Sequence, residues 1–193
     1  MAKVGLSQCF YAVYSYTSST DTVSYSDGGT LAKAVEVNIE LENAESVKFY
    51  ANNGVAESAS NFSSGTMTLT VDSLQLDELA AIMGLQTQSV TTPSGKSLSF
   101  PSTLTPPYLG YGTVAKMVVN NTQVFRALLL YKVQFEIPTD AFSTQGETIE
   151  FSGHELSAAI MRSDDTSSNW KTYADFSTEA NAIAWLKAQL SIT

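Results

Sequence analysis

At 193 residues the chain has the size of one ordinary domain, and a hydrophobic fraction of 44% is enough to build a core. Charged residues make up only 15% and the formal net charge is -9, which argues against a protein that grips nucleic acid through phosphate contacts. The single cysteine, Cys9, excludes an intramolecular disulfide. No apolar run approaches the length of a membrane-spanning helix and no secretory leader is recognisable, so we expect a protein made in a cytoplasm, without a membrane partner.

Charge is unevenly distributed along the chain. Residues 79–135 contain no acidic residue, whereas the segments on either side are acidic; the basic residues of this middle segment are Lys96, Lys116, Arg126 and Lys132. Two interpretations stay open. The basic segment either pairs with acidic segments of a neighbouring copy or neutralises acidic groups of its own fold.

Period-2 alternation of apolar and polar residues is the dominant pattern, and it marks strands with one buried and one polar face. Less regular strand patterns cover residues 6–14, 114–119 and 124–130. Clear alternation covers 35–42, 66–72 and 131–137, with a shorter case at 148–151. Strands of this number in one domain predict a mainly β fold, an antiparallel β-sandwich or barrel.

Two helices are predicted beside these strands. The first is capped by Asp72 or Ser73, ends at Gly84, and packs one face on the sheet through Leu76, Leu79, Ala80 and Met83. The second is a C-terminal helix at about 178–190, with an apolar side formed by Ala180, Ile183, Leu186 and Leu190. Because that side would otherwise face water, we expect the C-terminal helix to dock on the domain.

Turn-forming residues dominate two segments, 52–65 and 86–107, and both are predicted to be loops. A loop as long as the second is usually functional or ordered by a partner. No linker or internal repeat divides the chain, so residues 1–193 are predicted to form a single domain.

Motifs for catalysis are incomplete in this sequence. His154 is the only histidine, and Ala158 stands where a zinc-protease motif needs a second one. Gly95-Lys96-Ser97 resembles the end of a phosphate-binding loop, but Val90 replaces the first glycine and no helix pattern follows. We therefore expect no enzyme activity, no catalytic residues, no metal and no cofactor.

The polar sides of the predicted strands are uncharged or acidic, apart from Lys132. An ordinary solvated sheet face has this pattern. If copies join edge to edge into a ring, however, the same sides line a channel whose acidic wall repels duplex DNA. The residues predicted to line such a lumen are Glu36, Asn38, Glu40, Glu42, Thr66, Thr68, Thr70, Gln134, Glu136, Thr148 and Glu150.

Short segments along nearly the whole chain, in matching order and spacing, carry a family resemblance. They are Gly5-Leu6, Phe10-Tyr11-Ala12, residues 31–35, 47–53, 65–74, 106–112, 132–135 and 144–151. In these segments the chain resembles the major tail proteins, or tail tube proteins, of long-tailed bacteriophages.

The resemblance implies a β-sandwich or barrel of the tail-tube type with a flanking helix. It also implies a structural virion protein whose hexameric rings self-assemble and stack into a tube around a tape-measure protein, forming the channel for DNA ejection. Tail-terminator and baseplate or distal tail proteins are the further partners it implies, and the virion tail is the implied location. DNA would pass without specific binding. The family has no catalytic residues to carry over.

The segment 52–65 is predicted to contact a neighbouring subunit, because ordering it in a lone subunit would cost backbone entropy without return. The candidates for this contact are Asn52, Asn53, Glu57, Asn61 and Phe62.

Two alternative functions stay open. The chain could be the tube protein of a phage-related secretion system. It could also be a carbohydrate-binding or carbohydrate-hydrolysing β-sandwich that uses exposed Tyr and Trp residues with the paired carboxylates Glu40 and Glu42.

Overall fold

The structure, a computed structural model, describes residues 2–43, 47–51, 54–59, 62–119, 121–139 and 153–192. Neither helix of this described part is long and apolar enough to cross a membrane. The strands are β1 (Ala2–Thr17), β2 (Thr22–Asn43), β3 (Val47–Ala51), β4 (Gly54–Ala59), β5 (Phe62–Val71), β6 (Gln88–Thr91), β7 (Ser94–Ser97), β8 (Leu109–Val119), β9 (Thr122–Phe135), β10 (His154–Met161) and β11 (Lys171–Phe176). The helices are α1 (Leu76–Met83) and α2 (Glu179–Gln189), so the prediction of a mainly β fold with a flanking and a C-terminal helix is confirmed.

An antiparallel barrel forms the body of the molecule. Its strands follow the order β10-β5-β2-β1-β8-β9, and the barrel closes because β10 also pairs with β9. The closing contact is short, running from Ala158 opposite Phe135 to Met161 opposite Lys132. Along the same edge of β9, β11 then takes over, starting with Lys171 opposite Leu130. One edge of β9 is thus shared by two strands, and only one end of the barrel is closed.

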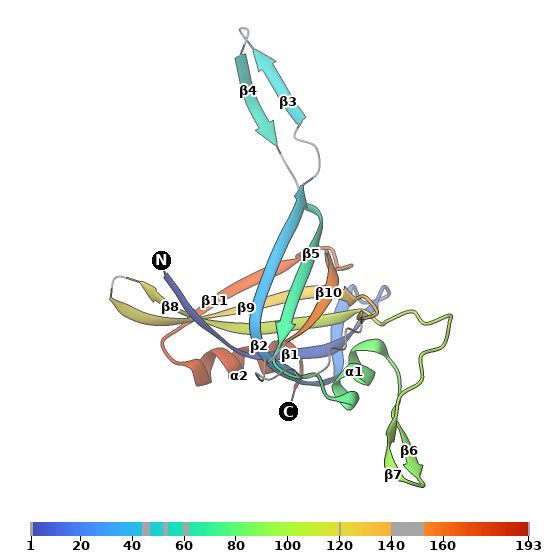
Figure 1. The fold of residues 1–193 in the computed structure, drawn as a ribbon. Coiled ribbons are helices and arrows are strands. Elements are labelled where there is room, and N and C mark those ends of the chain that lie inside the picture. Colours follow the sequence, from blue (N-terminus) through green and yellow to red (C-terminus); the bar gives the residue numbers. More distant parts are fainter. Residues whose placement is uncertain are drawn as a thin grey trace, which may run out of the picture.

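The barrel opens at its other end because β1 and β2 separate. Their pairing runs from Thr17 opposite Thr22 to Gln8 opposite Lys33. Beyond this point β2 pairs with β5 alone, and a register shift at Val35 marks a bulge that turns the strand away. Figure 1 shows the result: β2 and β5 rise as one ribbon, while β1, β8, β9 and β11 run to the side as a second sheet.

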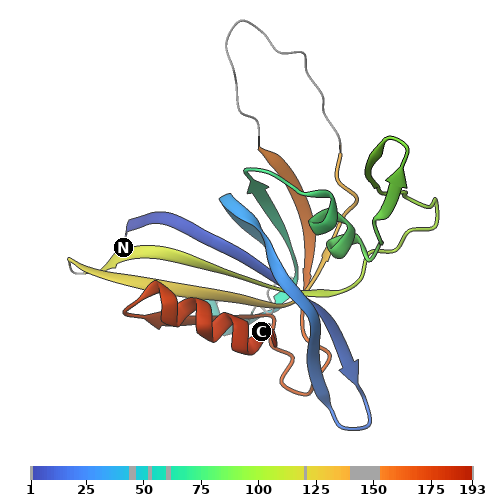
Figure 2. The same cartoon turned by 90° about the horizontal axis from the view of Figure 1, so that it is seen from below.

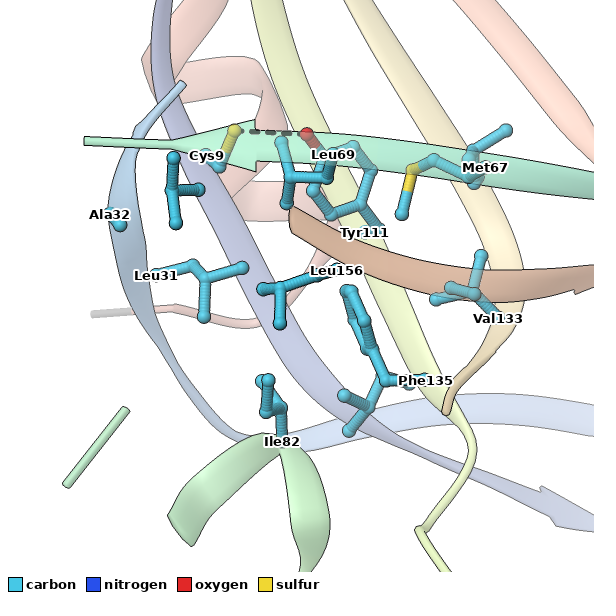
Figure 3. Packing of buried hydrophobic residues seen from close by; sticks show 14 of the residues in the cluster. Cys9, Leu31, Ala32, Met67, Leu69, Ile82, Tyr111, Val133, Phe135 and Leu156 are labelled. Carbon is cyan, nitrogen blue, oxygen red and sulfur yellow. Dashed lines mark hydrogen bonds between the residues drawn. The ribbon is translucent and has the colours of Figure 1, made fainter. Parts of the chain in front are cut away.

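The main core fills the inside of the barrel. Met67, Leu69 and Val71 of β5 are fully buried and alternate with polar residues that face outward, as their spacing predicted. Figure 3 shows Leu69, Tyr111, Phe135 and Leu156 converging from different strands, together with Ile82 from α1. The Cys9 thiol lies 2.9 Å from the Tyr111 hydroxyl in this core, and burial raises the pKa of the thiol. Cys9 is therefore a packed, unreactive core residue.

Helix α1 ends at Gly84 as predicted, and this residue adopts the left-handed conformation (φ 67°) that favours glycine at a helix end. The predicted cap is wrong, because Gln75 is the N-cap and its backbone N–H donates to Glu78 at 2.8 Å. Of the face predicted to pack on the sheet, Ala80 and Met83 are buried as expected, whereas Leu76 is exposed; Ile82, which was not predicted for this face, is also buried in the core.

Helix α2 covers the outer face of the second sheet, as Figure 2 shows. Thr178 caps it by accepting a hydrogen bond from the Asn181 backbone N–H. The docked side consists of Ala182, Leu186 and Leu190, which pack on β1, β8 and β9; Ala180, predicted for this side, is exposed. The side chains that contact the sheet are therefore spaced four residues apart. The predicted docking of this helix is confirmed.

Two glycines of β8 allow α2 to approach the sheet closely. A Cβ atom on Gly112 would lie 2.9 Å from Leu186 Cδ2, and one on Gly110 would lie 2.7 Å from Leu190 Cδ2 and 2.5 Å from the Tyr25 ring. Any side chain at these positions would push the helix away from the sheet.

Strands occupy parts of both predicted loops, which corrects the sequence interpretation. The segment 52–65 contains β4 and the start of β5, and β4 pairs with β3 in a hairpin beyond the ends of β2 and β5 (Figure 1). The segment 86–107 contains the β6–β7 hairpin, whose side chains are mostly exposed. The sequence pattern did not reveal these strands, because turn-forming residues dominate both segments and a short exposed hairpin needs little alternation of apolar and polar residues.

The connection between β10 and β11 is fastened to the β1–β2 hairpin. Asp21 accepts hydrogen bonds from the Thr166 backbone N–H at 3.1 Å, from the Thr166 hydroxyl, and from Tyr16 at 3.0 Å. At the other end of the connection, Asp164 accepts from Tyr14 at 3.1 Å and from the Lys132 ammonium at 2.6 Å. These contacts hold the chain where it leaves the barrel and crosses to β11.

Three bases of the basic middle segment form ion pairs within the chain. Lys96 pairs with Asp77, Arg126 pairs with Asp175 through two contacts at 2.6 and 2.7 Å, and Lys132 pairs with Asp164. All three partners lie in the acidic segments. For these residues the structure favours neutralisation within one fold over pairing with a neighbour.

The Asp21 contacts predict a pH dependence of stability. Hydrogen bonds from Thr166 and then Tyr16 lower the pKa of Asp21, so the stability it adds is complete above the ordinary aspartate pKa and is lost as pH falls through the lowered one. We expect the urea midpoint of Asp21→Asn to fall less than that of the wild type between about pH 5 and pH 3. Asp27→Asn is the matched control, because Asp27 has the same φ of 48° and, within the part of the chain that the structure describes, its carboxylate accepts a side-chain hydrogen bond only from the neighbouring Ser26. Equal slopes for wild type and Asp21→Asn would contradict this role.

The docking of α2 predicts a large cost for truncating its central anchor. Leu186 is fully buried between the helix and the sheet, so Leu186→Ala is expected to lower the free energy of unfolding by about 2–5 kcal/mol through lost burial and a cavity. Chemical denaturation measures this, with Gln189→Ala on the exposed side of the helix as the control. A change below about 1 kcal/mol would mean that the helix docks through other residues.

Candidate functional site

The predicted lumen residues of β2 and β5 lie side by side on the outer face of the barrel. Glu36 is opposite Thr70, Asn38 is opposite Thr68, and Glu40 is opposite Thr66. Glu42 continues the row opposite Ser64, whose hydroxyl donates to it at 2.8 Å. The structure therefore brings these predicted residues together, since the register of two strands aligns their polar sides.

Strand β10 extends this polar face across the barrel. Glu155 is opposite Thr70, Ser157 is opposite Thr68, and Ala159 is opposite Thr66, while Leu156, Ala158 and Ile160 point into the core. Sequence reasoning missed Glu155 and Ser157, although the alternation of Leu156, Ala158 and Ile160 was available to reveal the strand.

Strand β9 and the residue that follows it add the remaining described candidates, Gln134 and Glu136. Gln134 is opposite Ala159, and the Glu136 backbone N–H donates to the Ser157 carbonyl at 2.9 Å. Glu136 is exposed, whereas Gln134 is half-buried and its amide donates to the Pro106 carbonyl at 2.7 Å. Gln134 therefore marks the border of the polar face, where the segment before β8 covers it.

We call this face the polar strip. It comprises Glu36, Asn38, Glu40, Glu42, Thr66, Thr68, Thr70, Gln134, Glu136, Glu155 and Ser157. Every charge in this set is negative, and it crosses four neighbouring strands, β2, β5, β10 and β9. The predicted candidates Thr148 and Glu150 lie outside the described residues.

Lys132 does not place a free positive charge beside the polar strip. The residue as a whole is only 8% exposed. Its ammonium pairs with Asp164 and lies 4.3 Å from the Tyr108 ring centre and 5.3 Å from the Tyr14 ring centre. The ion pair and the two aromatic faces hold this cation in place, so the strip remains acidic next to it.

The candidates for a contact between subunits are described only in part. Asn52, Asn53 and Asn61 lie outside the described residues, and Glu57 is placed in β4 opposite Phe49 by its backbone. Phe62 stacks on Trp170 of the same chain, with ring centres 4.4 Å apart and planes 6° from parallel. This contact joins the start of β5 to the residue just before β11 within one subunit, and a role for Phe62 between subunits stays a prediction.

The residues weighed for catalysis are dispersed. His154 is exposed at the start of β10, and Lys96 of the Gly-Lys-Ser segment lies in β7, paired with Asp77. Within the described ranges, no three His, Cys, Asp or Glu side chains gather in a way that could hold a metal ion. The polar strip brings the described lumen candidates together, and its chemistry is that of an acidic, solvent-facing surface.

Comparisons with known proteins do not assign this chain to a family. No protein-family model matches it, and no curated protein matches it.

Proposed function

We propose that this chain is the major tail tube subunit of a long-tailed bacteriophage, a structural protein that forms stacked hexameric rings around a tape-measure protein. The observation that carries the proposal is the polar strip: side chains from four strands form one acidic face on the outside of a closed barrel. The resemblance in the sequence segments given above agrees with it.

The electrostatics of the strip suit a channel wall for DNA. A protein that binds DNA tightly does so by replacing counterions with Lys and Arg side chains at the phosphates. Glu36, Glu40 and Glu155 do the opposite, because carboxylates repel phosphates at short range. Duplex DNA would therefore pass along such a wall without being held, which is what ejection requires.

The proposed partners follow from this role. Copies of the same chain form the rings, and the tape-measure protein occupies the lumen during assembly. Tail-terminator and baseplate or distal tail proteins lie at the ends of the tube. The protein is made in the cytoplasm of the bacterial host and ends in the virion tail. No catalytic step, cofactor or metal is part of the proposal.

Electron microscopy of the purified protein tests the assembly. Negative-stain images of concentrated protein are expected to contain rings or hollow filaments of uniform width, with mass measured by light scattering. Dispersed globular monomers at every concentration and ionic strength would contradict the proposal.

The position of the strip in the tube can be tested with Thr66→Lys combined with Thr68→Lys. Both residues lie on β5, which is paired on both sides, so the variant should still assemble. The added lysines give DNA phosphates cations to bind. Assembled variant tubes are expected to retain labelled linear duplex DNA on sedimentation at low salt and to release it as salt rises.

Thr66→Gln with Thr68→Gln is the control, because it keeps polar side chains without adding charge. Closed circular DNA is the second control, since it cannot thread a tube. Equal retention of linear and circular DNA would place the strip on the outside of the tube, and no retention of either would remove it from the DNA path.

A further inference from the structure

The two diverging sheets leave an open hollow of about 710 Å³ between them. One wall is β2, with Val35, Val37, Ile39 and Leu41; the other is formed by β1, β8, β9 and β11. Several large apolar side chains at this hollow are exposed: Val35 by 62%, Tyr173 by 52% and Leu41 by 41%. Exposed apolar groups clustered in this way mark an interaction surface.

Two strand edges border the hollow without a partner among the described residues. From Val35 to Asn43, β2 pairs with β5 on one side only. From Lys171 to Phe176, β11 pairs with β9 on one side only. Each edge presents backbone N–H and C=O groups that a further strand can satisfy.

The two edges carry opposite charges. Glu36 and Glu40 project from β2, and Glu40 meets only the Asn38 amide among the described side chains. On β11, Asp175 is already neutralised by Arg126. The Lys171 ammonium lies 4.3 Å from the Trp170 ring centre and 4.8 Å from that of Tyr173, with no carboxylate partner in the described structure. The charge left over on β11 is therefore positive, facing a negative β2.

We propose that the free edge of β11 in one copy pairs with the free edge of β2 in the next copy. The inference rests on the proposed function and names the surfaces that join subunits within a ring. Because the edges are different parts of one surface, the contact is head-to-tail and each copy offers one edge of each kind. A second copy is the occupant because a single chain carries both complementary halves, with matching backbone groups, apolar side chains and charge.

A photo-crosslinker at Tyr173 tests the contact directly. The chain carries p-benzoylphenylalanine in place of Tyr173 and is otherwise wild type. Isotope-labelled and unlabelled copies are mixed in equal amounts, assembled, irradiated, and analysed by mass spectrometry. Mixed-isotope crosslinks to residues 35–43 are expected. The same probe at Phe100, an exposed aromatic position between β7 and β8, is the control and should not reach that peptide.

Val35→Lys tests the energetics of the same edge. The side chain is mostly exposed in the single subunit, so the melting temperature should not change, whereas a buried lysine in the joined sheet should lower the assembled fraction about tenfold at a fixed concentration. Val90→Lys on the exposed β6–β7 hairpin is the matched control and should assemble normally.

The outcomes separate this inference from the proposed function. Rings with crosslinks only to other segments, or rings formed equally well by Val35→Lys, would overturn the edge pairing and leave the tube proposal standing. Crosslinks between Tyr173 and 35–43 in small oligomers that never close would support the edge pairing and contradict the tube. Monomers that form neither rings nor crosslinks would overturn both the edge pairing and the tube proposal.

Discussion

The shared edge of β9 is the constraint on which the rest of this structure depends. Four residues at its end pair with β10 and close the barrel, whereas Phe125–Leu130 pair with β11 instead. A strand edge can satisfy only one neighbour at each position, so the barrel cannot close along its whole length. Closure at one end creates a sealed core and the continuous polar strip. Separation at the other end creates the second sheet, on which α2 docks, and leaves the open hollow between the two sheets.

The branch between β10 and β11 explains why polar contacts concentrate around one short connection. The chain must leave the barrel after Met161 and return to the same strand at Lys171. Asp164 and Lys132 hold the start of this crossing, and Asp21 holds its middle through Thr166. Lys132 is nearly buried there, which is tolerable because a carboxylate and two aromatic rings replace the water it loses. The same ion pair neutralises the lysine of β9 that stands two residues before Gln134, a member of the polar strip.

The acidic surface and the open edges have complementary roles in the proposed tube. The middle of the strip lies on β5, which is paired on both sides and therefore holds Thr66, Thr68 and Thr70 in register. Assembly needs the reverse, namely unsatisfied edges that another copy can complete. The two requirements meet on β2: its edge paired with β5 keeps Glu36, Asn38 and Glu40 aligned in the strip, while its other edge is free from Val35 to Asn43. A low overall charge of 15% charged residues suits a molecule with so much surface committed to contacts.

Local pattern in the sequence determined the mainly β class, the alternation of β5, the end of α1 at Gly84 and the presence of a docked C-terminal helix. These features depend on residue spacing within one element, which a sequence displays directly. It also identified Glu36, Asn38, Glu40 and Thr66 as polar-face residues. Only the tertiary structure decided that these side chains meet, because their alignment depends on the register between strands distant in sequence. The cap at Gln75 and the hairpins in the predicted loops were likewise beyond local pattern, whereas the alternation of Leu156, Ala158 and Ile160 does mark β10 and with it Glu155. The division of β9 between β10 and β11 was the least predictable feature, since no residue of β9 marks where pairing with one strand ends and pairing with the other begins.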